Sequence, residues 1–161
     1  MIEINNLTTN AIDEEFLKKV AEIVLKGESA SWRKEKADLS IALAGQGRIR
    51  ELNKKYRGRN KVTDVLAFPE SKVGYPHRNE VSGAGFKAGP IQKIQGLGEI
   101  VICLREVRKN AKKFVSTYNK ELARVLIHGI LHLFGYDHER SEKEEKIMRK
   151  KEEYYLSQFS S

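Results

Sequence analysis

The segment from Lys120 to Phe134 restricts the possible folds more than any other part of the sequence. Its length and spacing predict a helix, and its apolar residues leave almost no polar face. They are Leu122, Val125, Leu126, Ile127, Ile130, Leu131, Leu133 and Phe134. A helix that is apolar nearly all round is normally buried. The rest of the chain must therefore surround this helix.

Three of the 4 histidines lie in or just after this helix, at His128, His132 and His138. Residues four apart share one helical face, so the imidazoles of His128 and His132 project from the same side. Burying them without partners is costly, and a shared metal ion would be one such partner. Gly135 can take the positive φ that ends a helix, and the turn would bring His138 back toward the other two.

The ligand type indicates the metal. Neutral imidazole suits zinc, and three protein ligands leave one tetrahedral position for water, which is typical of a catalytic zinc rather than a structural one. We therefore predict one zinc ion held by His128, His132, His138 and a water. The alternative is that the three are ordinary hydrogen-bonded histidines at a coincidental spacing.

Periodicity and turn residues predict nine elements along the chain. Strands are expected at residues 2–7, 38–43, 63–68 and 100–104, and helices at residues 13–26, 47–56, 106–116, 120–134 and 142–158. The predicted fold class is α+β, a small mixed four-stranded sheet covered by helices, with a zincin-like metal site on the buried helix and the following turn. The chain has 161 residues and no dividing linker, so residues 1–161 are expected to form one domain. A long loop is expected at residues 70–97.

Charge and cysteine content limit the partners and the compartment. The net charge of +8 favours a polyanion such as RNA or DNA, although ordinary solubilising charge explains it equally well. Cys103 is the only cysteine, so no intrachain disulfide can form, which fits a reducing cytosol. The N-terminus lacks a signal-peptide pattern, and no apolar run is long enough to span a membrane. We expect a cytoplasmic protein with no membrane and no disulfide partner.

A basic cluster between residues 48 and 61 is the second functional candidate. It contains Arg48, Arg50, Lys54, Lys55, Arg57, Arg59 and Lys61, opposed by Glu51. Such a cluster can follow an RNA backbone or be a solvated basic face. The guanidinium of Arg57 can grip a phosphate with two N–H groups, or complement the dipole at the end of a helix. Two acids have open roles: Asp137 either orients a histidine or caps the turn, and Asp64 is expected to be structural.

The spacing of the histidines, HxxxHxxGxxH, also matches the metzincin protease signature. Those enzymes carry a glutamate directly after the first histidine, where it acts as the general base. That position is Gly129 in this chain. Peptide cleavage is therefore disfavoured, although the metal-binding arrangement can be shared.

The string HGILHLFGYDH, from His128 to His138, resembles the signature of the YbeY family of bacterial metal-dependent endoribonucleases. Two further segments resemble that family's pattern: LNKKYRGRNKVTDVLAFP at residues 52–69 and LGEIVIC at residues 97–103. The order of the three segments agrees across nearly the whole chain. Asn60, Ala67 and Glu99 stand where the family usually has Asp, Ser and Asp, and none of them is an expected metal ligand.

Membership would imply a zinc-dependent endoribonuclease that cuts single-stranded RNA. It would also imply a part in ribosomal RNA processing, notably maturation of the small-subunit 3′ end, and in ribosome quality control. Single-stranded RNA, ribosomal RNA and the ribosome are then the expected partners. The three histidines would hold the zinc and Arg57 would be catalytic. The basic cluster around Arg57 leads to the further expectation that Arg57, Arg59 and Lys61 bind substrate. Two alternatives are a metalloprotease-like zincin relative and a non-enzymatic, RNA-binding ribosome-assembly factor in which zinc serves structure.

Overall fold

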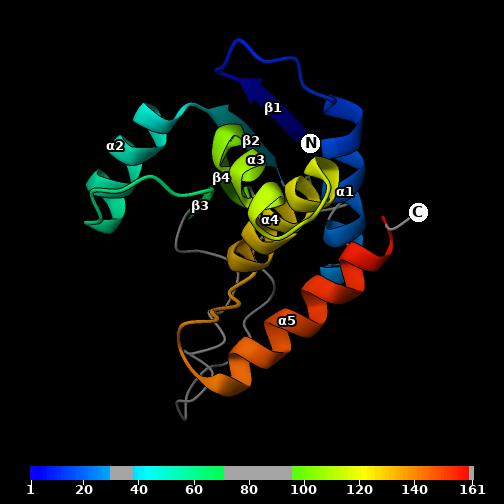
Figure 1. The fold of residues 1–161 in the computed structure, drawn as a ribbon. Coiled ribbons are helices and arrows are strands. Elements are labelled where there is room, and N and C mark those ends of the chain that lie inside the picture. Colours follow the sequence, from blue (N-terminus) through cyan, green and yellow to red (C-terminus); the bar gives the residue numbers. More distant parts are fainter. Residues whose placement is uncertain (30–37, 71–95, 160–161) are drawn as a thin grey trace.

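A computed structural model describes residues 1–29, 38–70 and 96–159 of the chain (Figure 1). All nine predicted elements are present in these residues. The strands are β1 (Ile2–Asn6), β2 (Leu39–Ala44), β3 (Val65–Pro69) and β4 (Gly98–Cys103). The helices are α1 (Glu14–Glu28), α2 (Gln46–Arg57), α3 (Leu104–Lys113), α4 (Tyr118–Leu133) and α5 (Glu142–Ser157). Apart from its two ends, the loop predicted at residues 70–97 lies outside the described residues.

The largest departure from the predicted boundaries is in α3, which was expected to run to residue 116. The helix begins directly after β4, with Cys103 as its N-cap, and ends at Lys113. Val115 has a φ of 51°, in the left-handed region that a β-branched residue rarely adopts. The backbone therefore leaves the helical path one turn earlier than the sequence pattern suggests.

The four strands form one mixed sheet in the order β1-β2-β4-β3. The strands β1, β2 and β4 run parallel, whereas β3 pairs antiparallel with β4. The mixed four-stranded α+β arrangement predicted from the sequence is confirmed. Because β3 is an edge strand, its outer side borders open space next to α4.

Alternate residues of the strands pack into two apolar layers, one on each face of the sheet. Ile41 and Ile100 are fully buried on the face that packs against α1 and α4. Ala42 and Val101 lie on the other face, in a smaller cluster with Ile49 of α2. Figure 1 shows α2 set apart from the other helices in agreement with this division.

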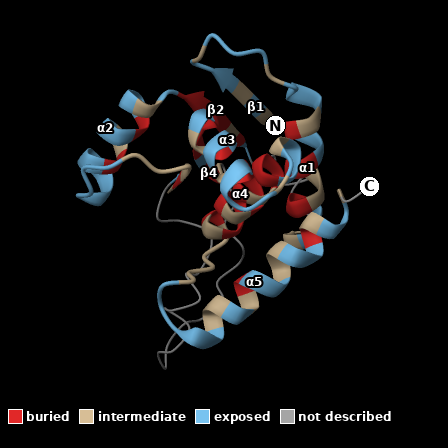
Figure 2. Cartoon of the chain, in the orientation of Figure 1, coloured by how far each residue is buried: buried red, intermediate tan, exposed pale blue. Residues whose placement is uncertain are grey.

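The predicted apolar helix is the centre of the larger layer. Leu126, Ile127 and Ile130 of α4 have no exposed surface, and α4 packs against the sheet and against α1, α3 and α5. Figure 2 shows the contrast between buried α4 and the largely exposed outer side of α5. Among the described residues, the helices all lack the length and apolar content needed to cross a membrane.

Candidate metal centre

The three histidines meet where α4 ends. The helix begins at Thr117, whose side chain accepts a hydrogen bond from the backbone N–H of Lys120. At the other end Gly135 has a φ of 91°, the positive value that glycine adopts without strain. The chain then turns back, so the ring centroid of His138 lies 5.0 Å from that of His128 and 5.2 Å from that of His132.

The arrangement of the three imidazoles fits a single metal ion. One nitrogen from each histidine lies within 4.8 Å of the others, and the Nε2 atoms of His128 and His132 are 2.9 Å apart. Tetrahedral zinc, with bonds of about 2.0–2.1 Å, holds two imidazole nitrogens about 3.3 Å apart. The rings would need only small shifts to bind one ion.

Burial and neighbouring imidazoles keep His132 in the neutral form that binds metals. Burial lowers the pKa of His132 to about 4, and repulsion from the neighbouring imidazoles of His128 and His138 adds to the effect. At neutral pH His132 is therefore uncharged and has a free lone pair. Nδ1 of His138 is buried and has no hydrogen-bond partner among the described residues. A buried nitrogen without a partner is costly, and a bound ion would remove that cost.

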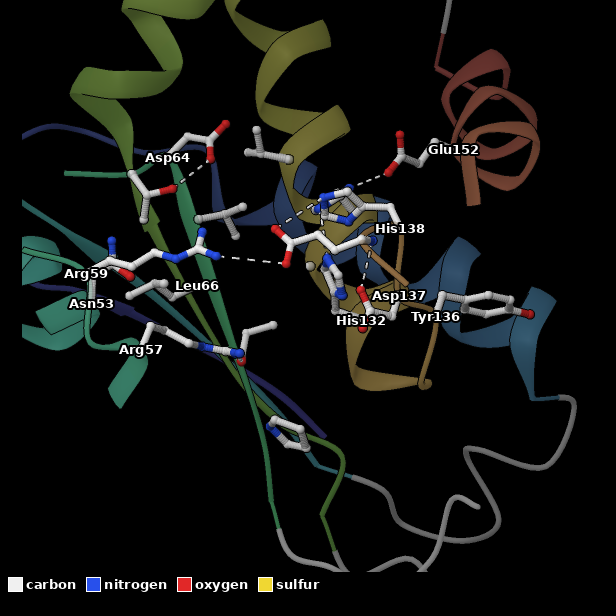
Figure 3. Close-up of a pocket in the computed structure, with 18 of the residues that line it drawn as sticks. Asn53, Arg57, Arg59, Asp64, Leu66, His132, Tyr136, Asp137, His138 and Glu152 are labelled. Carbon is white, nitrogen blue, oxygen red and sulfur yellow. Dashed lines mark hydrogen bonds and ion pairs between the residues drawn. The ribbon is translucent and has the colours of Figure 1, made fainter. Parts of the chain in front are cut away.

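Glu152 is a site residue that the sequence analysis missed. Its carboxylate in α5 accepts a hydrogen bond from Nδ1 of His128 (Figure 3). That bond fixes the imidazole tautomer and leaves Nε2 with its lone pair directed toward His132, a common arrangement around metal-bound histidines. Glu152 lies 24 residues from His128 in a helix with many glutamates, so no local pattern distinguishes it from its neighbours.

A buried acid helps to hold α5 in place. The carboxylate of Glu28, at the end of α1, accepts hydrogen bonds from the Tyr155 hydroxyl at 2.6 Å and the Lys151 ammonium at 2.9 Å. Burial alone would raise the pKa of Glu28, but these two hydrogen bonds, a further one from Tyr136 and the charge of Lys151 together lower the pKa. The charged Glu28 therefore stabilises the helix from which Glu152 reaches His128.

The predicted basic residues lie at the same site. Arg57, Arg59 and Lys61 line one cavity of about 640 Å³ together with the three histidines. Asn53 of α2 stabilises the loop that follows this helix and carries Arg59 and Lys61. Its buried side chain donates a hydrogen bond to the carbonyl of Lys61 at 2.9 Å. The α2 helix thus presents its basic C-terminal end to the histidine cluster.

Arg57 and Arg59 make different contacts. Nη2 of Arg57 donates a hydrogen bond to the carbonyl of Ala67 in β3 at 2.6 Å, and its guanidinium lies 5.9 Å from the Phe68 ring. Figure 3 shows Arg59 pointing toward the histidines. Its Nη2 lies 4.0 Å from a carboxylate oxygen of Glu139, whose other oxygen is 4.0 Å from Nε2 of His138.

The two acids with open roles have structural contacts. Oδ1 of Asp137 accepts a hydrogen bond from the backbone N–H of Glu139 at 3.0 Å, which caps the turn that returns His138. Oδ2 of Asp64 accepts one from the side chain of Asn110 at 3.3 Å and thereby ties β3 to α3. These contacts agree with the turn-capping role considered for Asp137 and with the structural role expected for Asp64.

Gly129 occupies the position of the protease glutamate because the sheet leaves little room there. A Cβ atom at this residue would lie 3.1 Å from Cγ2 of Ile100 and 3.3 Å from Cγ2 of Val65. Helix α4 therefore packs closely on β3 and β4 through this glycine. A glutamate at this position would make tight contacts with the side chains of Ile100 and Val65, which would have to shift to receive it.

A family model and the curated relatives of this chain both indicate the same family. The family model described as "Endoribonuclease YbeY" matches residues 3–160. Among curated relatives, proteins named "Endoribonuclease YbeY" include one from Thermodesulfovibrio yellowstonii that is 44% identical over 119 residues, 74% of this chain and 65% of that protein. The one from Bacillus subtilis is 30% identical over 145 residues, 90% of this chain and 87% of that protein.

A solved structure has the same fold. The alignment with the solution structure of a Thermotoga maritima protein covers 97% of this chain and 87% of that protein. The TM-score is 0.56 and the sequence identity is 32%. The family model spans nearly all of the sequence, including the histidine motif, the basic segment and the fourth strand. On these grounds the chain belongs to the YbeY endoribonuclease family.

Proposed function

We propose that this protein is a zinc-dependent, single-strand-specific endoribonuclease that acts in ribosomal RNA processing, at the 3′ end of the small-subunit RNA, and in ribosome quality control. One observation carries the proposal: three imidazoles suited to one metal ion and three cations suited to a phosphate line the same open cavity. Family membership supports the RNA substrate, and we include a cytoplasmic location in the proposal because the proposed ribosomal role requires one.

Zinc is the metal that best suits this ligand set, because all three donors are imidazoles and, among the described residues, no carboxylate or thiolate belongs to the cluster. When bound, zinc supplies Lewis acidity and a water acidified to a pKa of about 7. The neutral state of His132 and the Glu152 hydrogen bond to His128 prepare the protein side of the site.

The three cations have the chemistry to hold the scissile phosphodiester. Arg57 uses one guanidinium nitrogen on the carbonyl of Ala67, and its remaining N–H groups can bind phosphate oxygens as negative charge develops on them. Arg59 and Lys61 would contact the flanking backbone. Glu139 would then act as a charge partner that keeps Arg59 near His138.

Preference for single strands follows from the shape of the site. The histidines and cations lie inside a cavity between α4, β3 and the turn after α4, so a phosphate must enter a concave space. An unpaired strand can bend a phosphate inward and turn its bases outward, whereas the phosphates of an A-form duplex are held in a fixed helix.

The two alternative functions have less support. A peptidase would need a glutamate directly after the first histidine, where this chain has Gly129 packed against Ile100 and Val65. A non-enzymatic assembly factor would need no open metal position and no cations facing the metal ligands.

The test is cleavage of an unstructured RNA and of the same RNA annealed to its complement. We expect the zinc-loaded wild type to cut only the unpaired RNA, and His132→Ala and a chelated sample to cut neither. Zinc returned to the chelated sample should restore cleavage. Equal cutting by all samples would indicate a contaminating nuclease, and folded, zinc-bound wild type that cuts no RNA would favour the assembly-factor function.

A further inference from the structure

A second hollow lies next to the metal cavity and shares Arg124 with it. The hollow has a volume of about 460 Å³ and includes Phe114, Val115, Lys120 and Leu156 in its lining. Arg124 lies on α4 one helical turn before His128 and belongs to both cavities. Arg124 is therefore a lining residue that the two cavities have in common.

A buried carboxylate fixes the position of Arg124. Both oxygens of Glu121, which is 2% exposed, accept hydrogen bonds from the guanidinium of Arg124, and the bond from Nε measures 3.1 Å. The side chain of Arg124 is nevertheless 42% exposed. An arginine held in one orientation with its outer edge open loses little freedom when it binds a phosphate.

The hollow also presents an unusual apolar surface. Phe114 is 57% exposed, and Val115, at 94% exposure, is held at a positive φ. The Arg124 guanidinium lies 5.6 Å from the centre of the Phe114 ring, and the Lys113 ammonium lies 5.5 Å from it. Strained residues often mark functional sites, and an aromatic ring beside cations is the combination that single-stranded nucleic acids bind.

Helix α3, which ends beside Phe114 of the hollow, has the positive charge that RNA binding requires. Five of the ten residues of α3 are basic and one is acidic, and all five are exposed. They are Arg105, Arg108, Lys109, Lys112 and Lys113. Lys120 adds a further exposed cation at the start of α4. The single acid in the lining, Glu121, is already paired.

We propose that this hollow binds an unpaired nucleotide of the RNA whose scissile phosphate lies at the histidines. Its base stacks on Phe114, and its phosphate lies between Lys120 and Arg124. The proposal rests on the proposed function, because it extends the path of the same RNA strand. The two sites lie along α4, and the rise of a helix separates Lys120 from His128 by about 12 Å, so an RNA must be longer than a dinucleotide to reach from the histidines to Lys120.

The test measures how the affinity of the zinc-loaded protein depends on RNA length, with 2′-O-methyl RNAs from a dinucleotide to about twelve nucleotides. Phe114→Ala removes the stacking ring at an exposed position. Tyr154→Ala is the matched control, because Tyr154 is 62% exposed but lines neither cavity. We expect Phe114→Ala to weaken binding of the longest RNA by about 5- to 100-fold and to leave the dinucleotide unaffected.

A second variant tests the phosphate contact. Arg124→Lys keeps the charge next to Glu121 but loses the planar fork, so it should weaken binding of the long RNA and leave zinc content unchanged. Equal effects of Phe114→Ala and Tyr154→Ala, or equal losses for the dinucleotide and the long RNA, would overturn the proposal and favour a protein ligand. Length-dependent binding through Phe114 in a wild type that cuts no RNA would support this inference while overturning the proposed function.

Discussion

At the scale of single residues, the site depends on how the histidines are held as much as on the histidines themselves. His132 is kept neutral by burial, and His128 is oriented by Glu152. Arg57 connects the end of α2 to the carbonyl of Ala67 on the sheet edge. Each of these contacts predicts a separable effect on metal binding or on catalysis.

Removing the Glu152 carboxylate should weaken the metal site without removing a ligand. We expect Glu152→Ala to lower zinc affinity by about 10- to 100-fold, because the Nδ1–H of His128 loses its acceptor. Competition with a chromogenic chelator measures this directly. Glu153→Ala, at the exposed neighbouring position, is the control and should bind zinc as the wild type does. Equal affinities in the two variants would contradict the orienting role.

Exchanging Arg57 for lysine should show whether catalysis needs only a positive charge at this position or also the planar guanidinium group. Arg57→Lys keeps a cation at the cavity but removes the planar set of donors, so we expect kcat for RNA to fall by about 100-fold with zinc content unchanged. Arg48→Lys, on the same helix but outside the cavity, should keep wild-type kcat. Wild-type kcat in Arg57→Lys would mean that Arg57 serves only to hold α2 against β3.

At the scale of elements, the close packing of α4 on the sheet fixes the position of the site. Gly129 allows this approach, with Ile100 and Val65 at the limit of contact. The hydrogen bonds from Lys151 and Tyr155 to Glu28 hold α5 against the end of α1. The metal cavity therefore lies at the junction of α4, α5 and β3.

Gly129→Glu tests whether this packing excludes the protease base. We expect the substitution to lower the free energy of unfolding by about 1–3 kcal/mol, because the new side chain overpacks the contact with β4 and β3. No peptidase activity should appear. Gly47→Glu is the control, because a Cβ at Gly47 in α2 meets no atom within 4 Å. Urea denaturation measures both, and equal stabilities would contradict the packing account.

The sequence predicted those parts of the structure that follow from local pattern. The helix boundaries of α4 follow from its apolar run and Gly135, and the return of His138 follows from the same glycine. Glu152 was missed because its partner His128 is 24 residues away in the sequence. Arg124 and Asn53 have partners nearby in the sequence, but no local pattern shows which arginine or asparagine lies beside a cavity. The early end of α3 depends on the backbone at Val115, which no composition rule indicates.

At the scale of the whole molecule, two cavities that contain basic side chains both have residues of α4 in their linings. The metal cavity contains three histidines and three predicted phosphate-binding cations, and Arg124 continues into a second hollow beside the basic helix α3. The net charge of +8 is therefore concentrated in part where an RNA strand would pass. This arrangement explains why one small α+β protein would need both a buried metal site and an extended basic surface.

The most direct test of the central claim is a zinc titration of the metal-free protein in which RNA cleavage is followed in the same samples. The cleavage rate should rise linearly until one zinc is bound per chain and then remain constant, and His132→Ala should show neither tight zinc binding nor cleavage. A rate that is independent of zinc, or a His132→Ala variant that binds zinc and cuts RNA as the wild type does, would contradict the assignment of the three histidines as the catalytic metal site.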